Sequence, residues 1–199
     1  MNWEEKHMAK KKSNSQTIYQ IKITLKGSRP PIWRRFLVAS DITLGRLHRF
    51  LQPLMGWWDG HLHQFRIGNT YYADLNPEED LECFDDASDE NKVRLNEVLK
   101  KEKQKLIYEY DFGDGWEHEL VLEKILPAQE GMRHPVCLDG KRRCPPEDCG
   151  GIGGYENMLA GLKNPDHPEH DEWREWAPEG FDPEEFDLDE INASFRFPK

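Results

Sequence analysis

The chain has 199 residues, with 38 acidic and 27 basic side chains and a net charge of −11. A hydrophobic content of 37% is enough for the core of one globular domain. No apolar run reaches the roughly 20 residues of a membrane-spanning helix, and the N-terminus lacks the pattern of a signal peptide. We therefore expect a cytoplasmic protein without a membrane segment, a disordered leader over residues 1–15 and a single domain over residues 16–199.

The acidic surplus is concentrated near the C-terminus. Residues 166–190 hold twelve acidic side chains and one base, Arg174, while the remaining 26 acids and 26 bases balance. An acidic surplus repels phosphate backbones and disfavours nucleic-acid binding. The same carboxylates suit the first turns of helices, where they complement the helix dipole.

Four segments have the residue pattern of strands. Residues 17–26, "TIYQIKITLK", alternate strictly between apolar and polar side chains, and residues 32–40 form a second apolar run after two prolines. Residues 61–75 predict a hairpin that turns at Gly68 and Asn69. Residues 105–126 predict a second hairpin that turns at Asp114 and Gly115, because this dipeptide readily adopts positive φ values.

Helical spacing appears in three places. Apolar residues predict a helix over residues 43–56, capped by Asp41 or Thr43, in which Pro53 should kink or shorten the last turn. Residues 155–162 predict a short helix, and a last helix should begin after Asp187. The pattern indicates an α+β fold, with a mostly antiparallel sheet, a helix across one face and a helical, loop-rich C-terminal third.

Residues 134–151, "HPVCLDGKRRCPPEDCGG", hold three of the four cysteines. Three thiolates and one imidazole can bind a tetrahedral zinc ion, although the spacing does not match a paired C-x-x-C knuckle. A reducing compartment disfavours a disulfide framework. Both a structural zinc site and an ordered loop with free cysteines therefore fit. The zinc ligands would be Cys137, Cys144, Cys149 and His134.

Histidines form a second group. His61 and His63 are two residues apart on one expected strand face, roughly 6.6 Å along it, and His118 lies on the strand of the other hairpin. With a carboxylate such as Asp111, they could bind a catalytic metal ion. Histidines among aromatic residues also occur as hydrogen-bonded core residues, which is the interpretation favoured for His48.

Five stretches together resemble the Ri-plasmid ORF-three-like family, whose members are also called insertion-element passenger or TnpR-like proteins. They are "YQIKITLKGSRPPIWRRFLV", "LGRLHRFLQPLMGWWDGHLHQF", "YEYDFGDGWEHELVLE", "CPPEDCGGIGGY" and "FDPEEFDLDEIN". The resemblance covers residues 17–195 and implies a compact α+β domain of plasmids, mobile elements and prokaryotic chromosomes, without an established activity. Pro53 departs from the helical residue expected there. The motif residues include His61, His63, Asp111, Asp114, His118, Glu147, Asp148 and Asn192.

Three functions follow from these observations. The leading hypothesis is a non-enzymatic accessory or binding domain, associated with mobile elements through the resemblance, with one structural zinc. The alternative is a metal-dependent hydrolase that uses His61, His63, His118 and Asp111. A third interpretation is a module that binds a basic protein through exposed tryptophans and acidic loops. Its tryptophans would be Trp57, Trp58, Trp173 and Trp176. The recombinase activity that the TnpR name suggests needs a basic tail, whereas this chain ends in an acidic segment.

Overall fold

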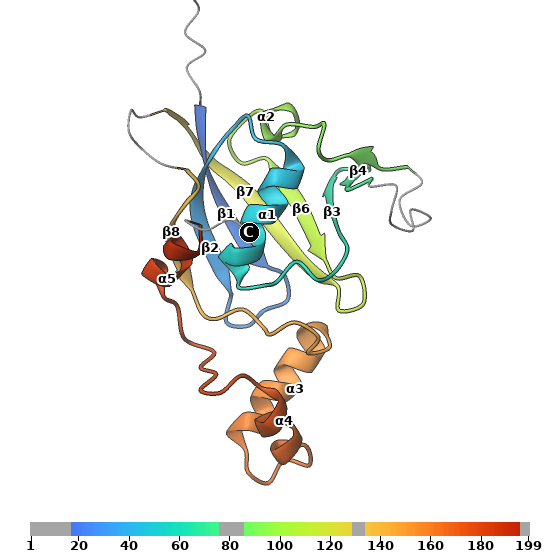
Figure 1. The fold of residues 1–199 in the computed structure, drawn as a ribbon, viewed down its shortest axis with the longest axis vertical. Coiled ribbons are helices and arrows are strands. Elements are labelled where there is room, and N and C mark those ends of the chain that lie inside the picture. The colour runs from blue at the N-terminus through green and yellow to red at the C-terminus, as the bar shows by residue number, and fades with distance from the viewer. Residues whose placement is uncertain (1–16, 76–85, 129–133, 196–199) are drawn as a thin grey trace, which may run out of the picture.

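The computed structural model describes residues 17–75, 86–128 and 134–195 (Figure 1). The expected leader over residues 1–15 lies outside the described residues. The strands are β1 (Thr17–Leu25), β2 (Trp33–Ala39), β3 (His63–Ile67), β4 (Thr70–Ala73), β5 (Ser88–Asp89), β6 (Lys105–Tyr110), β7 (Trp116–Pro127) and β8 (Val136–Lys141). The helices are α1 (Leu44–Met55), α2 (Leu95–Val98), α3 (Gly151–Lys163), α4 (His170–Trp176) and α5 (Leu188–Ser194).

The strands form one eight-stranded sheet in the order β5-β4-β3-β6-β7-β1-β2-β8. Among the strand pairs of the described residues, only that of β4 with β5 is parallel, so the predicted α+β class with a mostly antiparallel sheet is confirmed. Helix α1 lies across one face of this sheet, whereas α3 and α4 project beyond one end of the strands (Figure 1). The predicted arrangement of one helix on the sheet and a helical C-terminal third is therefore also confirmed.

The alternating strand β1 behaves as its sequence predicts. Tyr19, Ile21, Ile23 and Leu25 are buried on the face toward the core, and β1 pairs with β2 on one side and β7 on the other. A central strand with one apolar face is held in register, because a shift of one residue would turn every apolar side chain outward. Strand β1 is therefore a fixed inner strand of the sheet that also carries the site described below.

Helix α1 begins and ends as expected. The Thr43 hydroxyl accepts a hydrogen bond from the backbone N–H of Arg46 at 3.3 Å, and Gly56 follows the last turn in the left-handed conformation. The helix continues through Pro53 to Met55, so the predicted shortening at this proline is wrong. Its buried face includes His48 and Gln52, which places polar side chains against the sheet.

The two hairpins are present, but the second has a longer turn than predicted. Strands β3 and β4 turn at Gly68 as expected. In the β6–β7 hairpin the last pair is Tyr110 with Trp116, so five residues, 111–115, form the connection. Asp111 adopts a φ of 56° and accepts a hydrogen bond from the backbone N–H of Gly115 at 2.6 Å. The expected two-residue turn is therefore wrong.

The C-terminal third contains an edge strand that the sequence pattern did not predict. Residues 136–141 pair with β2 as strand β8, although they belong to the segment interpreted as a cysteine loop. Asn192 on α5 bonds both backbone groups of Cys137, with its Oδ1 2.8 Å from the N–H and its Nδ2 3.0 Å from the carbonyl oxygen. This pair attaches α5 to the edge of the sheet. Helix α4 begins at His170, in a segment outside the three helices that the sequence pattern predicts.

No helix in residues 17–75, 86–128 and 134–195 is both long enough and apolar enough to cross a membrane.

Candidate functional site

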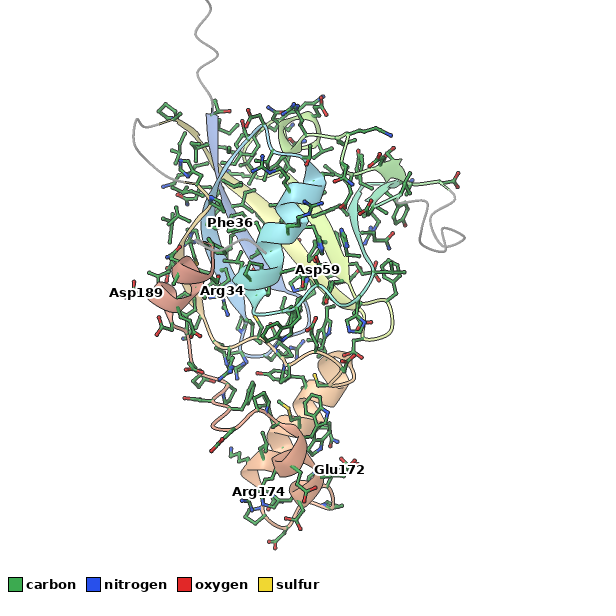
Figure 2. All side chains as sticks on the ribbon, viewed as in Figure 1. Arg34, Phe36, Asp59, Glu172, Arg174 and Asp189 are labelled. Atoms are coloured by element: carbon green, nitrogen blue, oxygen red, sulfur yellow. The ribbon has the colours of Figure 1, made fainter. Side chains whose placement is uncertain are left out.

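A polar cleft opens between the first half of α1, the segment that leads into β3 and the residue that follows β5. Its volume is about 330 Å³, at the lower end of the range for small-ligand sites. Figure 2 shows Asp59 at this place, beside α1 on the side of β3, and away from Glu172 and Arg174 on α4. The ionisable side chains of the cleft are three carboxylates, one arginine and three histidines. They are Asp59, Asp74, Glu90, Arg49, His48, His61 and His63.

His48 is the centre of a buried hydrogen-bond network in this cleft. Its Nε2 lies 2.6 Å from Asp59 Oδ1, and its Nδ1 lies 2.9 Å from the hydroxyl of Tyr108. Gln52 Nε2 donates to the same hydroxyl at 2.8 Å. Burial lowers the pKa of His48 although the hydrogen bond to Asp59 raises it. We therefore assign a neutral imidazole that donates from Nε2 to Asp59 and accepts the Tyr108 proton at Nδ1.

His63 forms the second half of the cleft wall. Its ring stacks on that of His48, with centroids 3.4 Å apart and planes 4° from parallel. Its Nε2 lies 3.0 and 3.1 Å from the two oxygens of Glu90, whose side chain is 2% exposed. A buried carboxylate needs such a donor because removing it from water is costly. Gly45 leaves room for the side chains of Glu90 and Asn91, since a Cβ at this position would lie 2.9 Å from Glu90 Oε1 and 2.4 Å from Asn91 Oδ1.

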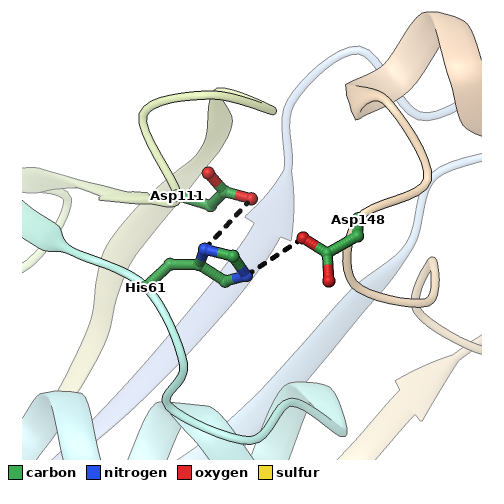
Figure 3. A group of neighbouring side chains, drawn as sticks. All are labelled: His61, Asp111 and Asp148. Carbon is green, nitrogen blue, oxygen red and sulfur yellow. Dashed lines mark ion pairs between the residues drawn. The ribbon is translucent and has the colours of Figure 1, made fainter.

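At the mouth of the cleft, His61 stands between two carboxylates that come from distant parts of the chain (Figure 3). Its Nδ1 lies 3.8 Å from Asp111 Oδ2, and its Nε2 lies 3.2 Å from Asp148 Oδ1. The Asp111 side chain is 10% exposed, whereas that of Asp148 is 71% exposed. Within the described parts of the chain, this is the one group of three or more His, Cys, Asp or Glu ligand atoms that lie within 4.8 Å of one another.

The predicted histidine cluster is only partly assembled. His61 and Asp111 come together, but His63 faces Glu90 instead. His118 is fully buried, with its ring centroid 5.1 Å from that of Trp57 and 5.5 Å from that of Tyr108. Burial lowers the pKa of His118 to about 4, although weaker interactions with the backbone of Tyr108 and Trp116 partly oppose this shift. Neither interaction meets the geometry of a hydrogen bond. His118 is therefore a core residue in this structure.

The four candidate zinc ligands near the C-terminus do not lie in one such group among the described residues. Cys144 Sγ lies 3.4 Å from Arg34 Nη2, Cys149 Sγ lies 4.0 Å from the carbonyl oxygen of Gly151, and Cys137 belongs to β8. These three cysteines are free thiols, and no described partner bonds the ring nitrogens of His134. Zinc binding by these residues stays a prediction.

The tryptophans have different environments. Trp57 is 5% exposed and donates from Nε1 to the carbonyl oxygen of Pro145 at 2.9 Å, so it belongs to the core. Trp58 is 80% exposed and precedes Asp59 at the cleft. Trp173 and Trp176 form an edge-to-face pair on α4, with centroids 5.5 Å apart. Of the predicted set, Trp58 is the one that directly precedes a cleft residue, Asp59, in the sequence.

Sequence reasoning missed several residues of this site. Glu90 lies outside the quoted motifs, and Asp59, although inside one of them, was not predicted as a site residue. Their roles depend on long-range contacts with His63 and His48. Asp148 was among the motif residues of the family resemblance, which was the one indication of its importance. Asp148 stands between Cys144 and Cys149, where no local spacing pairs its carboxylate with His61 or Asp111.

Comparisons with known proteins place the chain among proteins without a stated activity. A sequence profile of plasmid pRiA4b ORF-3-like proteins matches residues 17–190. The uncharacterised protein y4hQ of Sinorhizobium fredii (strain NBRC 101917 / NGR234) is 37% identical over 161 residues, which cover 80% of each chain. The crystal structure of a protein of unknown function, MM3350 from Methanosarcina mazei Go1, has a TM-score of 0.79 and 37% identity, covering 87% of this chain and 97% of that one.

Proposed function

The chain belongs to the family of plasmid pRiA4b ORF-3-like proteins. Because the relatives above carry no stated activity, we propose a function from the polar cleft itself. The protein is a non-enzymatic binding domain that accepts the positively charged side chain of a partner protein, an arginine or a lysine. The family is the one that the sequence motifs indicated.

The buried carboxylate of Glu90 carries this proposal. An ionised carboxylate can accept about four hydrogen bonds, yet within the described residues Glu90 accepts only from His63 Nε2. Its remaining acceptor capacity faces the cleft that it lines. Hydrogen bonds between a carboxylate and a guanidinium or ammonium group are among the strongest that proteins make.

The charge balance of the cleft supports a cationic guest. Three carboxylates, Asp59, Asp74 and Glu90, line it against the single base Arg49. A basic peptide segment fits this combination better than an anionic ligand would.

The metal-dependent hydrolase built on His61, His63, His118 and Asp111 is less well supported. It requires these four side chains around one ion, whereas His118 packs against Trp57 and His63 faces Glu90. The binding domain requires only the cleft and its carboxylates.

A titration followed by NMR tests the proposal. N-acetyl-arginine amide and N-acetyl-lysine amide are added to the ¹⁵N-labelled protein, with N-acetyl-glutamate amide as the probe of opposite charge. We expect saturable shifts at Trp58, Gly60 and His63 with the two cationic probes and none with the anionic one. Shifts that are equal for all three probes, or that map outside the cleft, would contradict the proposal.

Two variants sharpen the test. Glu90→Gln keeps the shape of the side chain and should weaken binding about 10- to 100-fold, because a hydrogen bond to a charged group contributes about 1.5–3 kcal/mol. Asp74→Asn, at the partly exposed rim, should weaken binding without unfolding the protein if Glu90→Gln proves unstable. Glu117→Gln, which changes a carboxylate paired with Lys26 on the sheet, is the matched control and should bind as the wild type does. Wild-type affinity in both cleft variants would overturn the proposal.

A further inference from the structure

We infer that His61, Asp111 and Asp148 bind a divalent transition-metal ion, with Zn²⁺ as the best fit. One imidazole and two carboxylates are a usual donor set for zinc, and three protein ligands leave further positions for water or a ligand. This inference does not rest on the proposed cation binding, which depends on Glu90 and Asp74; of the three metal ligands only His61 lines the cleft. It differs from the cysteine zinc site in every ligand.

Asp111 supplies the first observation. Its side chain is nine-tenths buried, and its Oδ1 accepts from the backbone N–H groups of Gly113 and Asp114 at 2.9 and 3.3 Å. Its Oδ2 points toward His61 Nδ1 at 3.8 Å, which is too long for a hydrogen bond. No described residue donates a hydrogen bond to Oδ2. With no described donor, Oδ2 has acceptor capacity left, and a cation beside His61 Nδ1 would be a suitable partner for it.

The 3.8 Å between His61 Nδ1 and Asp111 Oδ2 also suits two ligands of one metal ion. Zinc lies about 2.0–2.1 Å from a histidine nitrogen and about 2.0–2.2 Å from a carboxylate oxygen. Two ligand atoms 3.8 Å apart can therefore share one ion without moving, whereas two atoms in a hydrogen bond are closer together. Asp148 Oδ1 lies 3.2 Å from the other ring nitrogen of His61, Nε2, so the Asp148 side chain must rotate to reach an ion held by Nδ1 and Asp111. Its exposure of 71% leaves it free of close packing that would prevent this.

A hydrogen-bond hub fixes the three segments that carry these ligands. The Tyr110 hydroxyl accepts from the backbone N–H of Gly60 at 3.0 Å and donates to Glu147. The other oxygen of Glu147 accepts from the backbone N–H of Trp58 at 3.2 Å. Gly60, Tyr110 and Glu147 each directly precede one of the three ligands in the sequence. The hub therefore sets the spacing of His61, Asp111 and Asp148 before any ion binds.

A second bond supports the same arrangement. Asp114 Oδ2 accepts from the backbone N–H of Gly150 at 3.1 Å, so the turn between β6 and β7 is tied to the loop before α3. Bonds of this kind orient ligands, and their loss commonly reduces metal affinity 10- to 100-fold. The three ligands are thus positioned both by the Tyr110 hub and by the bond between Asp114 and Gly150, although they are far apart in the sequence.

Calorimetry on protein freed of metal by a chelator tests the inference, with Zn²⁺ as the titrant. We expect saturable binding of one Zn²⁺ per chain at this site. Asp148→Asn should reduce the affinity at least about 10-fold, and His61→Ala should do the same. Asp148 is exposed, so its variant should fold normally. Asp171→Asn, which changes an acidic residue on α4, is the control and should retain the wild-type affinity.

Cobalt spectroscopy separates this site from the predicted cysteine site. Co²⁺ bound to thiolates gives an intense charge-transfer band in the near ultraviolet, whereas Co²⁺ bound by nitrogen and oxygen does not. We expect Co²⁺ binding without that band, lost in Asp148→Asn. Wild-type affinity in both ligand variants, a thiolate band for the bound ion, or no saturable uptake of Zn²⁺ would each overturn the inference. None of these outcomes would decide the proposed cation binding, whose test uses Glu90 and Asp74.

Discussion

Replacement of His118 by phenylalanine should make the protein less sensitive to mild acid. His118 is fully buried and packs against Trp57 and Tyr108. Among the described residues, only weak interactions with the backbone of Tyr108 and Trp116 act on its ring nitrogens. Burial penalises the protonated ring and lowers its pKa from the ordinary 6.5 to about 4. In the unfolded chain the same ring is exposed to water and takes up a proton near its ordinary pKa.

The size of the effect follows from this difference in pKa. Between the two values the unfolded state binds the proton and the folded state does not, so stability falls as the pH decreases. One pKa unit corresponds to about 1.4 kcal/mol, so the full difference costs the folded state about 3 kcal/mol by pH 4. From pH 7 to pH 5 the loss from this residue should be about 2 kcal/mol. A phenylalanine cannot titrate and removes that loss.

Urea denaturation followed by tryptophan fluorescence at pH 7 and pH 5 measures the effect. The wild type should lose about 2 kcal/mol more of its free energy of unfolding between these pH values than His118→Phe does. Any packing strain from the larger ring is present at both pH values and cancels in the comparison. His167→Gln, outside the core cluster, should retain the wild-type difference. An equal pH dependence in His118→Phe and the wild type would refute the assignment of His118 as a buried, neutral ring.

Two other predictions concern the C-terminal third. Gly154→Ala should lower the free energy of unfolding by about 1–3 kcal/mol, because a Cβ there would lie 1.8 Å from the carbonyl oxygen of Cys149. At the neighbouring Gly153 an added Cβ would have nothing within 4 Å, so Gly153→Ala should raise the free energy of unfolding by up to about 1 kcal/mol. Equal changes for the two variants in urea denaturation would contradict this packing. Cys137, Cys144 and Cys149 should resist iodoacetamide at pH 8 even with a chelator present, because burial raises the pKa of each thiol, that of Cys149 to about 12. Peptide mass spectrometry should find them alkylated only after denaturation, and modification of the native protein would show that they are accessible.

The sequence by itself determined the regular elements that repeat a local pattern. Alternation in residues 17–26 predicted β1, and apolar spacing together with Thr43 predicted α1. Asp187 predicted the start of α5, and its side chain accepts a hydrogen bond from the backbone N–H of Glu190. The ordered motifs also identified the family correctly. These features depend on residues a few positions apart, so a linear pattern contains them.

Only the tertiary structure decided which side chains meet. Strand β8 forms because β2 offers an edge to a segment that has little strand pattern of its own. The His48 and His63 rings stack although they come from α1 and β3, and Glu90 reaches His63 from beyond β5. His61, Asp111 and Asp148 come from three separate segments joined by the Tyr110 hub. Contacts between residues so far apart depend on the packing of whole elements, which no local periodicity records.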